Sequence, residues 1–274
     1  MIRRILTYAT LLTTFACTSA EESSSQTVHD TPPASFFRAI DVYPKRTGAL
    51  YFMQVGNLDL DLDDLLNRSA KVIEEQLQIS FSKMVILGEG EYPALKNTDI
   101  LLYFIREQDA KAANLVPSFG SNVGACCVGS AAFTRDRRDN LFNEDNYESM
   151  KKLTNHPYDP LISATSLGFV IADHPSCFPE AINYIAIHEI GHFLGGAHIE
   201  SFDTDEISQF PYLFYMIAGS DCSNLSYARA YPTFDPENVQ KIHTFLAKTT
   251  NASREEIVER RRESLEQTVI VKKP

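Results

Sequence analysis

The stretch from His188 to His198 reads His-Glu-Ile-Gly-His-Phe-Leu-Gly-Gly-Ala-His. Its first half ends a predicted helix, Pro179 to Leu194, whose side chains are apolar on nearly every face. We expect such a helix to be buried, and burying two imidazoles and a carboxylate without partners costs free energy. A bound divalent metal ion compensates all three groups. The polar residues of this helix therefore indicate a metal site.

The spacing of the three histidines predicts how they can reach one ion. His188 and His192 are four residues apart, so a helix places them on one face, one turn apart. His198 lies six residues further on, and on a continuing helix a rotation of about 600° would point it away from the ion. The helix must therefore end between them, and Gly195 can adopt the left-handed conformation that ends a helix. Three protein ligands and one open position are what a catalytic Zn²⁺ requires, so we predict zinc as the cofactor.

Glu189 has a separate predicted role. It directly follows His188 and cannot reach the same coordination position. It can hold a water at the metal and take its proton. The sequence therefore predicts Glu189 as a general base.

The whole stretch matches H-E-x-x-H-x-x-G-x-x-H, and in this it resembles the metzincin metalloproteases. The resemblance implies that the three histidines bind zinc, that Glu189 is the general base, and that a methionine-containing turn lies beneath the metal. Met216 is the methionine that follows the motif and is the candidate for this supporting role, together with Gly195. Ile199 departs from the residues that mark the known branches, which are serine, aspartate, glutamate or proline.

The resemblance extends to the fold. Leu167 to His174 and the helix after it resemble the strand and active-site helix of the reprolysin-like and matrixin-like branches. Val123 to Phe133 resembles their antiparallel edge strand, and Asp235 to Ala247 their C-terminal helix. The resemblance implies an α/β fold with a mixed twisted sheet, an antiparallel edge strand, a buried active-site helix and a small C-terminal subdomain after Gly195.

The N-terminal half contains further predicted elements. Gly48 to Gly56 is an apolar, aromatic run that predicts a strand, and Asp59 to Ser80 has helical apolar spacing. Met84 to Leu87 and Ile100 to Ile105 are predicted inner strands. Arg135 to Tyr158 is charged and rich in Asn and Asp, which favours a surface loop.

Four aspartates at the start of the predicted first helix are interpreted as capping residues. They are Asp59, Asp61, Asp63 and Asp64. Calcium binding is the alternative, but the twelve-residue calcium loop with its glycine is missing from the sequence.

Residues 1–20 are typical of a bacterial export signal, with Arg3 and Arg4 before an apolar stretch. Two processing routes stay open. Thr14-Phe15-Ala16-Cys17 resembles a lipobox, which would make Cys17 a lipid anchor, and Ala20 is the alternative cleavage site. Residues 21–35 have the composition of a flexible linker. We therefore expect an exported protein, either lipid-anchored in the cell envelope or secreted.

Composition and charge predict the domain bounds and the kinds of partner. Residues 36–250 are the predicted catalytic domain, and 251–274 a charged C-terminal helix or tail. A net charge of −11 and a pI near 5.1 exclude nucleic acids and anionic membrane surfaces as partners, because both are polyanions. We expect a monomer that meets a membrane only through an anchor at Cys17.

Four cysteines remain after the signal, namely Cys126, Cys127, Cys177 and Cys222. In an exported protein an even number suggests disulfides, and four cysteines allow three connectivities. The neighbours Cys126 and Cys127 are too close for ordinary disulfide geometry, which favours longer links to the other two.

The function expected from these residues is that of a zinc endopeptidase acting on peptides or proteins. Two alternatives stay open: a zinc amidase acting on a non-protein amide, and a surface lipoprotein that binds a partner without cleaving it. The segment 200–215 contributes aromatic residues beside the predicted site, which indicate an apolar side-chain preference. These are Phe202, Phe210, Tyr212 and Phe214.

Overall fold

A single five-stranded sheet forms the centre of the computed structural model, which describes residues 45–113, 115, 129–131, 144–173, 179–199, 215 and 233–266. Its strands are β1 (Lys45–Gln54), β2 (Ile79–Leu87), β3 (Ile100–Ile105), β4 (Gly129–Ala131) and β5 (Leu167–Ile171). They lie in the order β2-β1-β3-β5-β4. The first four in this order are parallel, and β4 pairs antiparallel with β5. The chain is therefore a mixed α/β protein.

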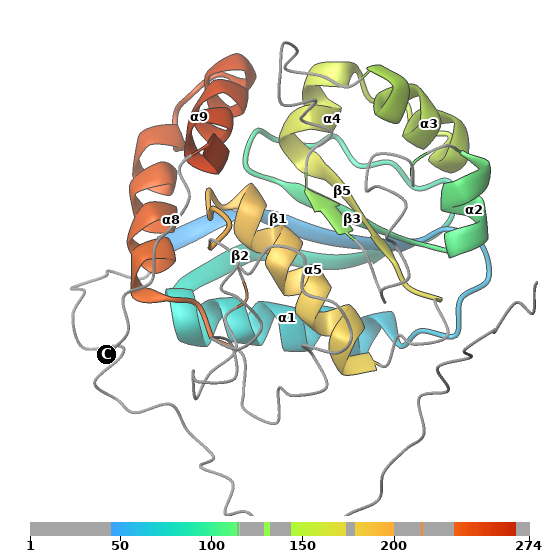
Figure 1. Cartoon of the computed structure of the whole chain (residues 1–274), viewed down its shortest axis with the longest axis horizontal. Helices are drawn as coiled ribbons and strands as arrows, with labels where there is room; N and C mark the ends of the chain where they lie inside the picture. Colours follow the sequence, from blue (N-terminus) through green and yellow to red (C-terminus); the bar gives the residue numbers. More distant parts are fainter. Residues whose placement is uncertain are drawn as a thin grey trace, which may run out of the picture.

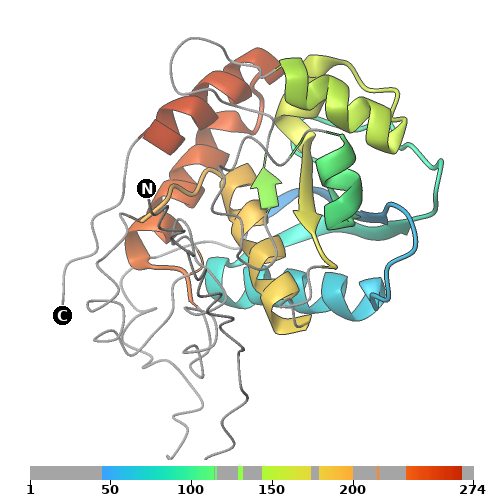
Figure 2. The ribbon, with the colours of Figure 1, turned by 45° about the vertical axis from the view of Figure 1, so that its right-hand side comes forward.

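Helices cover both faces of the sheet. The described part of the chain contains α1 (Leu62–Leu77), α2 (Glu107–Ala112), α3 (Glu144–Thr154), α4 (Pro160–Ser166), α5 (Pro179–Phe193), α8 (Pro236–Thr249) and α9 (Arg254–Glu266). Helices α1 and α5 lie on one face, and α2, α3 and α4 lie on the other (Figure 1). Helices α8 and α9 lie side by side at one end of the sheet (Figures 1 and 2). None of the described helices has the length and apolar character needed to cross a membrane.

The strand sequences explain why two helical layers are needed. All six residues of β3, Ile-Leu-Leu-Tyr-Phe-Ile, are buried, so both of its faces are apolar. Alternate residues of a strand point to opposite faces, and along β1 Leu50 and Phe52 join the core under α1 and α5. Ala49, Tyr51 and Met53 join the core on the other side. A parallel sheet of this kind is stable only when both faces are covered.

Helix α1 confirms one capping prediction and corrects two boundaries. The Asp61 side chain accepts a hydrogen bond from the Asp64 amide at 3.0 Å, which is N-capping. The helix was predicted to extend to Ser80, but it ends at Leu77 because Gln78 has φ 53°, and β2 begins at once. Strand β2 is therefore longer than the predicted Met84 to Leu87. The prediction was too short because the first half of the strand is polar and partly exposed, which hides the strand pattern.

The loop predicted for Arg135 to Tyr158 is wrong over its second half, where the chain forms α3. Tyr147 and Met150 are three residues apart on this helix and are both buried, and Met150 joins the core on this face of the sheet. Two apolar side chains are enough to pack this helix on the rest of the protein. In a charged sequence, however, two such residues give only a weak amphipathic pattern. Residues 135–143 lie outside the described residues.

The edge strand predicted over Val123 to Phe133 is not seen at that length among the described residues. Only Gly129–Ala131 is described, and these residues pair with Gly168 to Val170 of β5. The rest of the range lies outside the described residues, as do Cys126, Cys127, Cys177 and Cys222. The disulfide alternatives therefore stay predictions.

The C-terminal helices complete the described structure. Helix α8 begins after its N-cap, Asp235, and continues to Thr249, two residues beyond the predicted end. Helix α9 contacts α4, α5 and α8. The Arg254 guanidinium at the start of α9 donates to the Leu95 carbonyl and to the Thr165 hydroxyl. The charged range 251–274 thus supplies a helix that packs on the same body as the sheet.

Candidate metal centre

Helix α5 carries two of the histidines into a buried position. Its apolar residues pack into the core between the sheet and α1, and the Ser69 hydroxyl of α1 donates to the Asn183 amide oxygen of α5 at 3.0 Å. His188, Glu189 and His192 are only 7%, 4% and 5% exposed. The helix therefore places three polar side chains where water is largely excluded.

A glycine turn ends α5 and reverses the chain. Gly195 has φ 96°, the left-handed conformation predicted for it. The Gly195 amide donates to the His192 carbonyl at 3.0 Å, and the Gly196 amide donates to the Gly191 carbonyl at 2.8 Å. These two bonds form a Schellman motif. The turn brings His198 back beside the helix.

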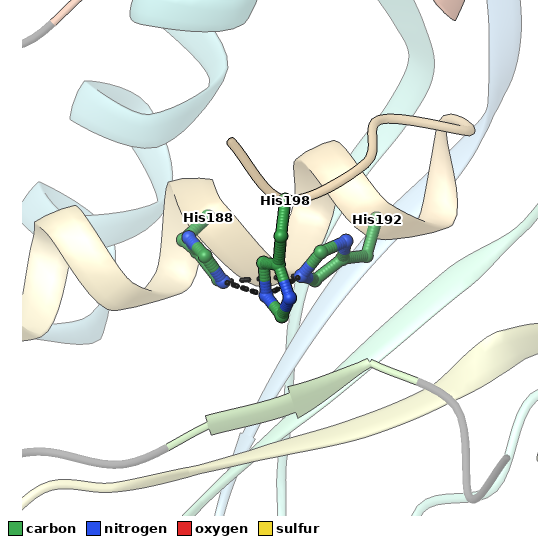
Figure 3. A group of neighbouring side chains, drawn as sticks. All are labelled: His188, His192 and His198. Carbon is green, nitrogen blue, oxygen red and sulfur yellow. Dashed lines mark hydrogen bonds between the residues drawn. The ribbon is translucent and has the colours of Figure 1, made fainter. Parts of the chain in front are cut away.

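The three imidazoles converge on one point (Figure 3). The Nε2 atoms of His188 and His192 are 3.1 Å apart, those of His192 and His198 2.9 Å, and those of His188 and His198 3.3 Å. Two nitrogens bound tetrahedrally to zinc at about 2.0–2.1 Å are about 3.3 Å apart. The observed triangle has the size that one small metal ion requires.

Main-chain carbonyls fix the tautomers of the two helical histidines. His188 Nδ1 donates to the Tyr215 carbonyl at 2.5 Å, and His192 Nδ1 donates to the Gly196 carbonyl at 3.0 Å. In a neutral imidazole, a proton on Nδ1 leaves a lone pair on Nε2. Two such lone pairs face each other across 3.1 Å and cannot hydrogen-bond, because neither nitrogen is a donor. A cation shared between them fits this arrangement.

Burial keeps the same two rings neutral. It lowers the pKa of His188 to about 3, although the bond to the Tyr215 carbonyl acts in the opposite direction. Burial also lowers the pKa of His192 well below its ordinary value, and the neighbouring histidines add to the effect. The neutral imidazole is the form that binds metals.

Tyr215 contributes to the centre through its main-chain carbonyl, a role that its side-chain type does not predict. Its amide donates to the Thr233 carbonyl at 2.9 Å. Its ring stacks on Tyr184, with centroids 5.3 Å apart, and lies 5.1 Å from Phe234. These contacts fix the carbonyl that orients His188. Sequence reasoning missed this role, because any residue type supplies a carbonyl.

A second group that the sequence did not reveal fixes the main chain directly before His198. The Ala197 amide donates to the Asn238 side-chain oxygen at 2.8 Å. The Asn238 amide nitrogen donates in turn to the Asp235 carboxylate at 2.8 Å, and both side chains are fully buried. Burial raises the pKa of Asp235, and its bonds to Asn238 oppose that change. The Asp-Pro pair at the start of α8 is a visible capping signal, but nothing in the sequence links it to residue 197.

The remaining predicted site residues are placed as follows. Glu189 follows His188 on α5 and is buried. His198 is more exposed than His188 and His192, so the triad is open to solvent on the His198 side. Met216 lies outside the described residues, as do Phe202, Phe210, Tyr212 and Phe214, and their roles stay predictions.

Searches for similar proteins returned no matching family model and no matching curated protein. The described residues themselves show a histidine triad that can hold a metal ion. Any functional proposal for this chain therefore depends on the geometry of that triad.

Replacing His192 by alanine is expected to abolish metal binding, because two remaining nitrogens hold an ion weakly. Metal content after dialysis against a stoichiometric zinc solution, measured by mass spectrometry, tests this. His156→Gln is the control, since His156 is also buried but lies in the core on the other face of the sheet beside Tyr147 and Tyr158. Equal zinc content in the parent and His192→Ala would contradict the assignment of ligands.

Gly195→Ala is expected to destabilise the protein for two separable reasons. A β-carbon at position 195 would lie 2.3 Å from the Phe245 ring, and the positive φ disfavours any side chain, at about 1–2 kcal/mol. Urea unfolding of Gly195→Ala, of Phe245→Gly and of the double variant separates the two costs. Glycine at position 245 removes the ring and also its β-carbon, which would lie 2.5 Å from the added β-carbon. The steric part is therefore expected to vanish in the double variant, and the backbone part to persist. Strictly additive losses would refute the steric contact.

Proposed function

We propose that this chain is a zinc-dependent endopeptidase of metzincin type. The ligands would be His188, His192 and His198, and Glu189 would act as general base. One observation carries the proposal: three imidazole nitrogens lie within 3.3 Å of one another, and carbonyls hold two of them in the metal-binding tautomer.

The donor set supports zinc over other common ions. Imidazole nitrogen suits zinc, whereas calcium and magnesium take oxygen ligands. Three nitrogens held in a triangle leave a fourth tetrahedral position open, which distinguishes catalytic from structural zinc sites. The more exposed side of the triad, at His198, is where this position would meet substrate.

The proposed chemistry is hydrolysis of an amide by water. A bound zinc ion supplies a Lewis acid that polarises the scissile carbonyl and lowers the pKa of water. The Glu189 carboxylate accepts the proton from the attacking water and then delivers it to the leaving amine. Because Glu189 is buried, its charge acts in a weakly screened environment. No covalent link between chain and substrate is required.

The position of β4 supports an extended peptide as substrate. This strand is the last in the sheet order, and it contacts α5. It lies on the side to which the histidine rings point (Figure 3). An extended peptide can add main-chain hydrogen bonds to such an outer strand, which aligns its amide bonds along the triad.

The decisive experiment is Glu189→Ala assayed beside the parent on a diverse peptide library. The variant is expected to keep zinc, because all three histidines remain, and to lose about 10² to 10⁴ in rate, the usual contribution of a general base. Glu148→Ala is the matched control, since Glu148 is exposed on α3. If the parent binds zinc and a protein partner but cleaves no peptide, the binding-module alternative replaces the protease. If the parent cleaves only non-protein amides, the amidase alternative replaces the protease.

The proposal includes export, with monomeric mature protein anchored at Cys17 or secreted after cleavage at Ala20. The motivating observation is the order of basic, apolar and small residues in 1–20. Mass spectrometry of the mature N-terminus is expected to find either a lipid-modified Cys17 or a free Glu21. Recovery of the protein with residues 1–20 intact would contradict both routes.

A further inference from the structure

Helix α9 holds the end of the helix that carries two of the histidines. Arg261 of α9 is 2% exposed and donates to carbonyls of Ala164, Thr165 and Phe193, at 2.8, 3.0 and 3.4 Å. Its guanidinium also lies 5.0 Å from the Phe193 ring centre. Phe193 is the last residue of α5 and directly follows the ligand His192.

The choice of partners explains how this arginine is buried. All three acceptors are carbonyls at the C-terminal ends of α4 and α5, and such carbonyls have no partner within their own helix. The helix dipole makes these ends negative, which favours a cation there. The fork of the guanidinium can therefore fix two helix ends at once.

Ser264 of α9 holds the next part of the chain. It lies one turn after Arg261 on the same face of the helix. Its hydroxyl donates to the Gly195 carbonyl at 2.6 Å. Gly195 is the left-handed residue of the turn between His192 and His198.

Movement of this turn would disturb two ligands together. His198 lies three residues after Gly195, and its Nε2 is 2.9 Å from that of His192. Gly196, in the same turn, supplies the carbonyl that orients His192. The position of the Gly195 carbonyl is thus linked to the direction of both imidazoles.

We propose that α9 is a positioning element of the metal centre, in which Arg261 and Ser264 clamp the end of α5 and the Gly195 turn so that His198 stays at ligand distance. The inference rests on the metal site of the proposed function. It assigns a role to the charged C-terminal helix, which contributes no ligand.

The test is zinc affinity of the full-length chain, measured by competition with a chromophoric chelator. Ser264→Ala is expected to raise the Kd about 3- to 10-fold, the range that corresponds to one lost hydrogen bond. Ser264→Thr restores the hydroxyl and is expected to return the Kd to within about twofold of the parent. Ser82→Ala is the matched control, because Ser82 is exposed on β2 and lies far along the sheet order from β4.

Thermal unfolding of the metal-free proteins provides the second readout. A serine with a purely structural role would lower the melting temperature and leave the Kd unchanged, and that result overturns the clamp. Arg261→Lys keeps the charge but loses the fork, so its Kd is expected to rise at least as much as for Ser264→Ala. A parent-like Kd in both variants also overturns the clamp while the metal site stands. A parent that binds no zinc instead refutes the proposed function, and the clamp with it.

Discussion

Three imidazole nitrogens held within 3.3 Å of one another, two of them with inward-facing lone pairs, are the arrangement on which the rest of this structure depends. Neutral rings with fixed Nδ1 donors repel one another at this distance, since their negative ends meet. Other contacts in the fold must therefore hold the rings at this distance against that repulsion. The Tyr215 and Gly196 carbonyls, the Asn238 side chain and helix α9 are those contacts.

The sheet matters to the centre mainly as a rigid support for α5. Strands buried on both faces give the helix a flat apolar surface, and α1 fixes it from the side. A helix held along its length can present two histidines with little freedom. The third histidine is on irregular chain, and there individual hydrogen bonds to Ala197 and Gly195 hold the main chain that leads to it.

The sequence predicted the parts of the centre that depend on residue type and spacing. The histidine triad and the left-handed Gly195 were visible because only a few residue types can fill those positions. Strand β3 was predicted with its observed bounds because a fully apolar run of six has few alternatives. Helix α3 was missed because its two buried anchors, Tyr147 and Met150, are diluted by charged neighbours. The Tyr215 and Gly196 carbonyls could not be predicted, since main-chain acceptors are the same in every residue.

The hydrogen bonds of Arg261 and Ser264 also have a consequence for the order of events during synthesis. A chain leaves the ribosome from its N-terminus, and early elements can fold before late ones exist. The sheet, α1 and α5 are complete long before residue 264 emerges. The turn between His192 and His198 receives the Arg261 and Ser264 contacts only after α9 has emerged. A nascent chain therefore carries all three histidines for a time without the α9 contacts that hold this turn.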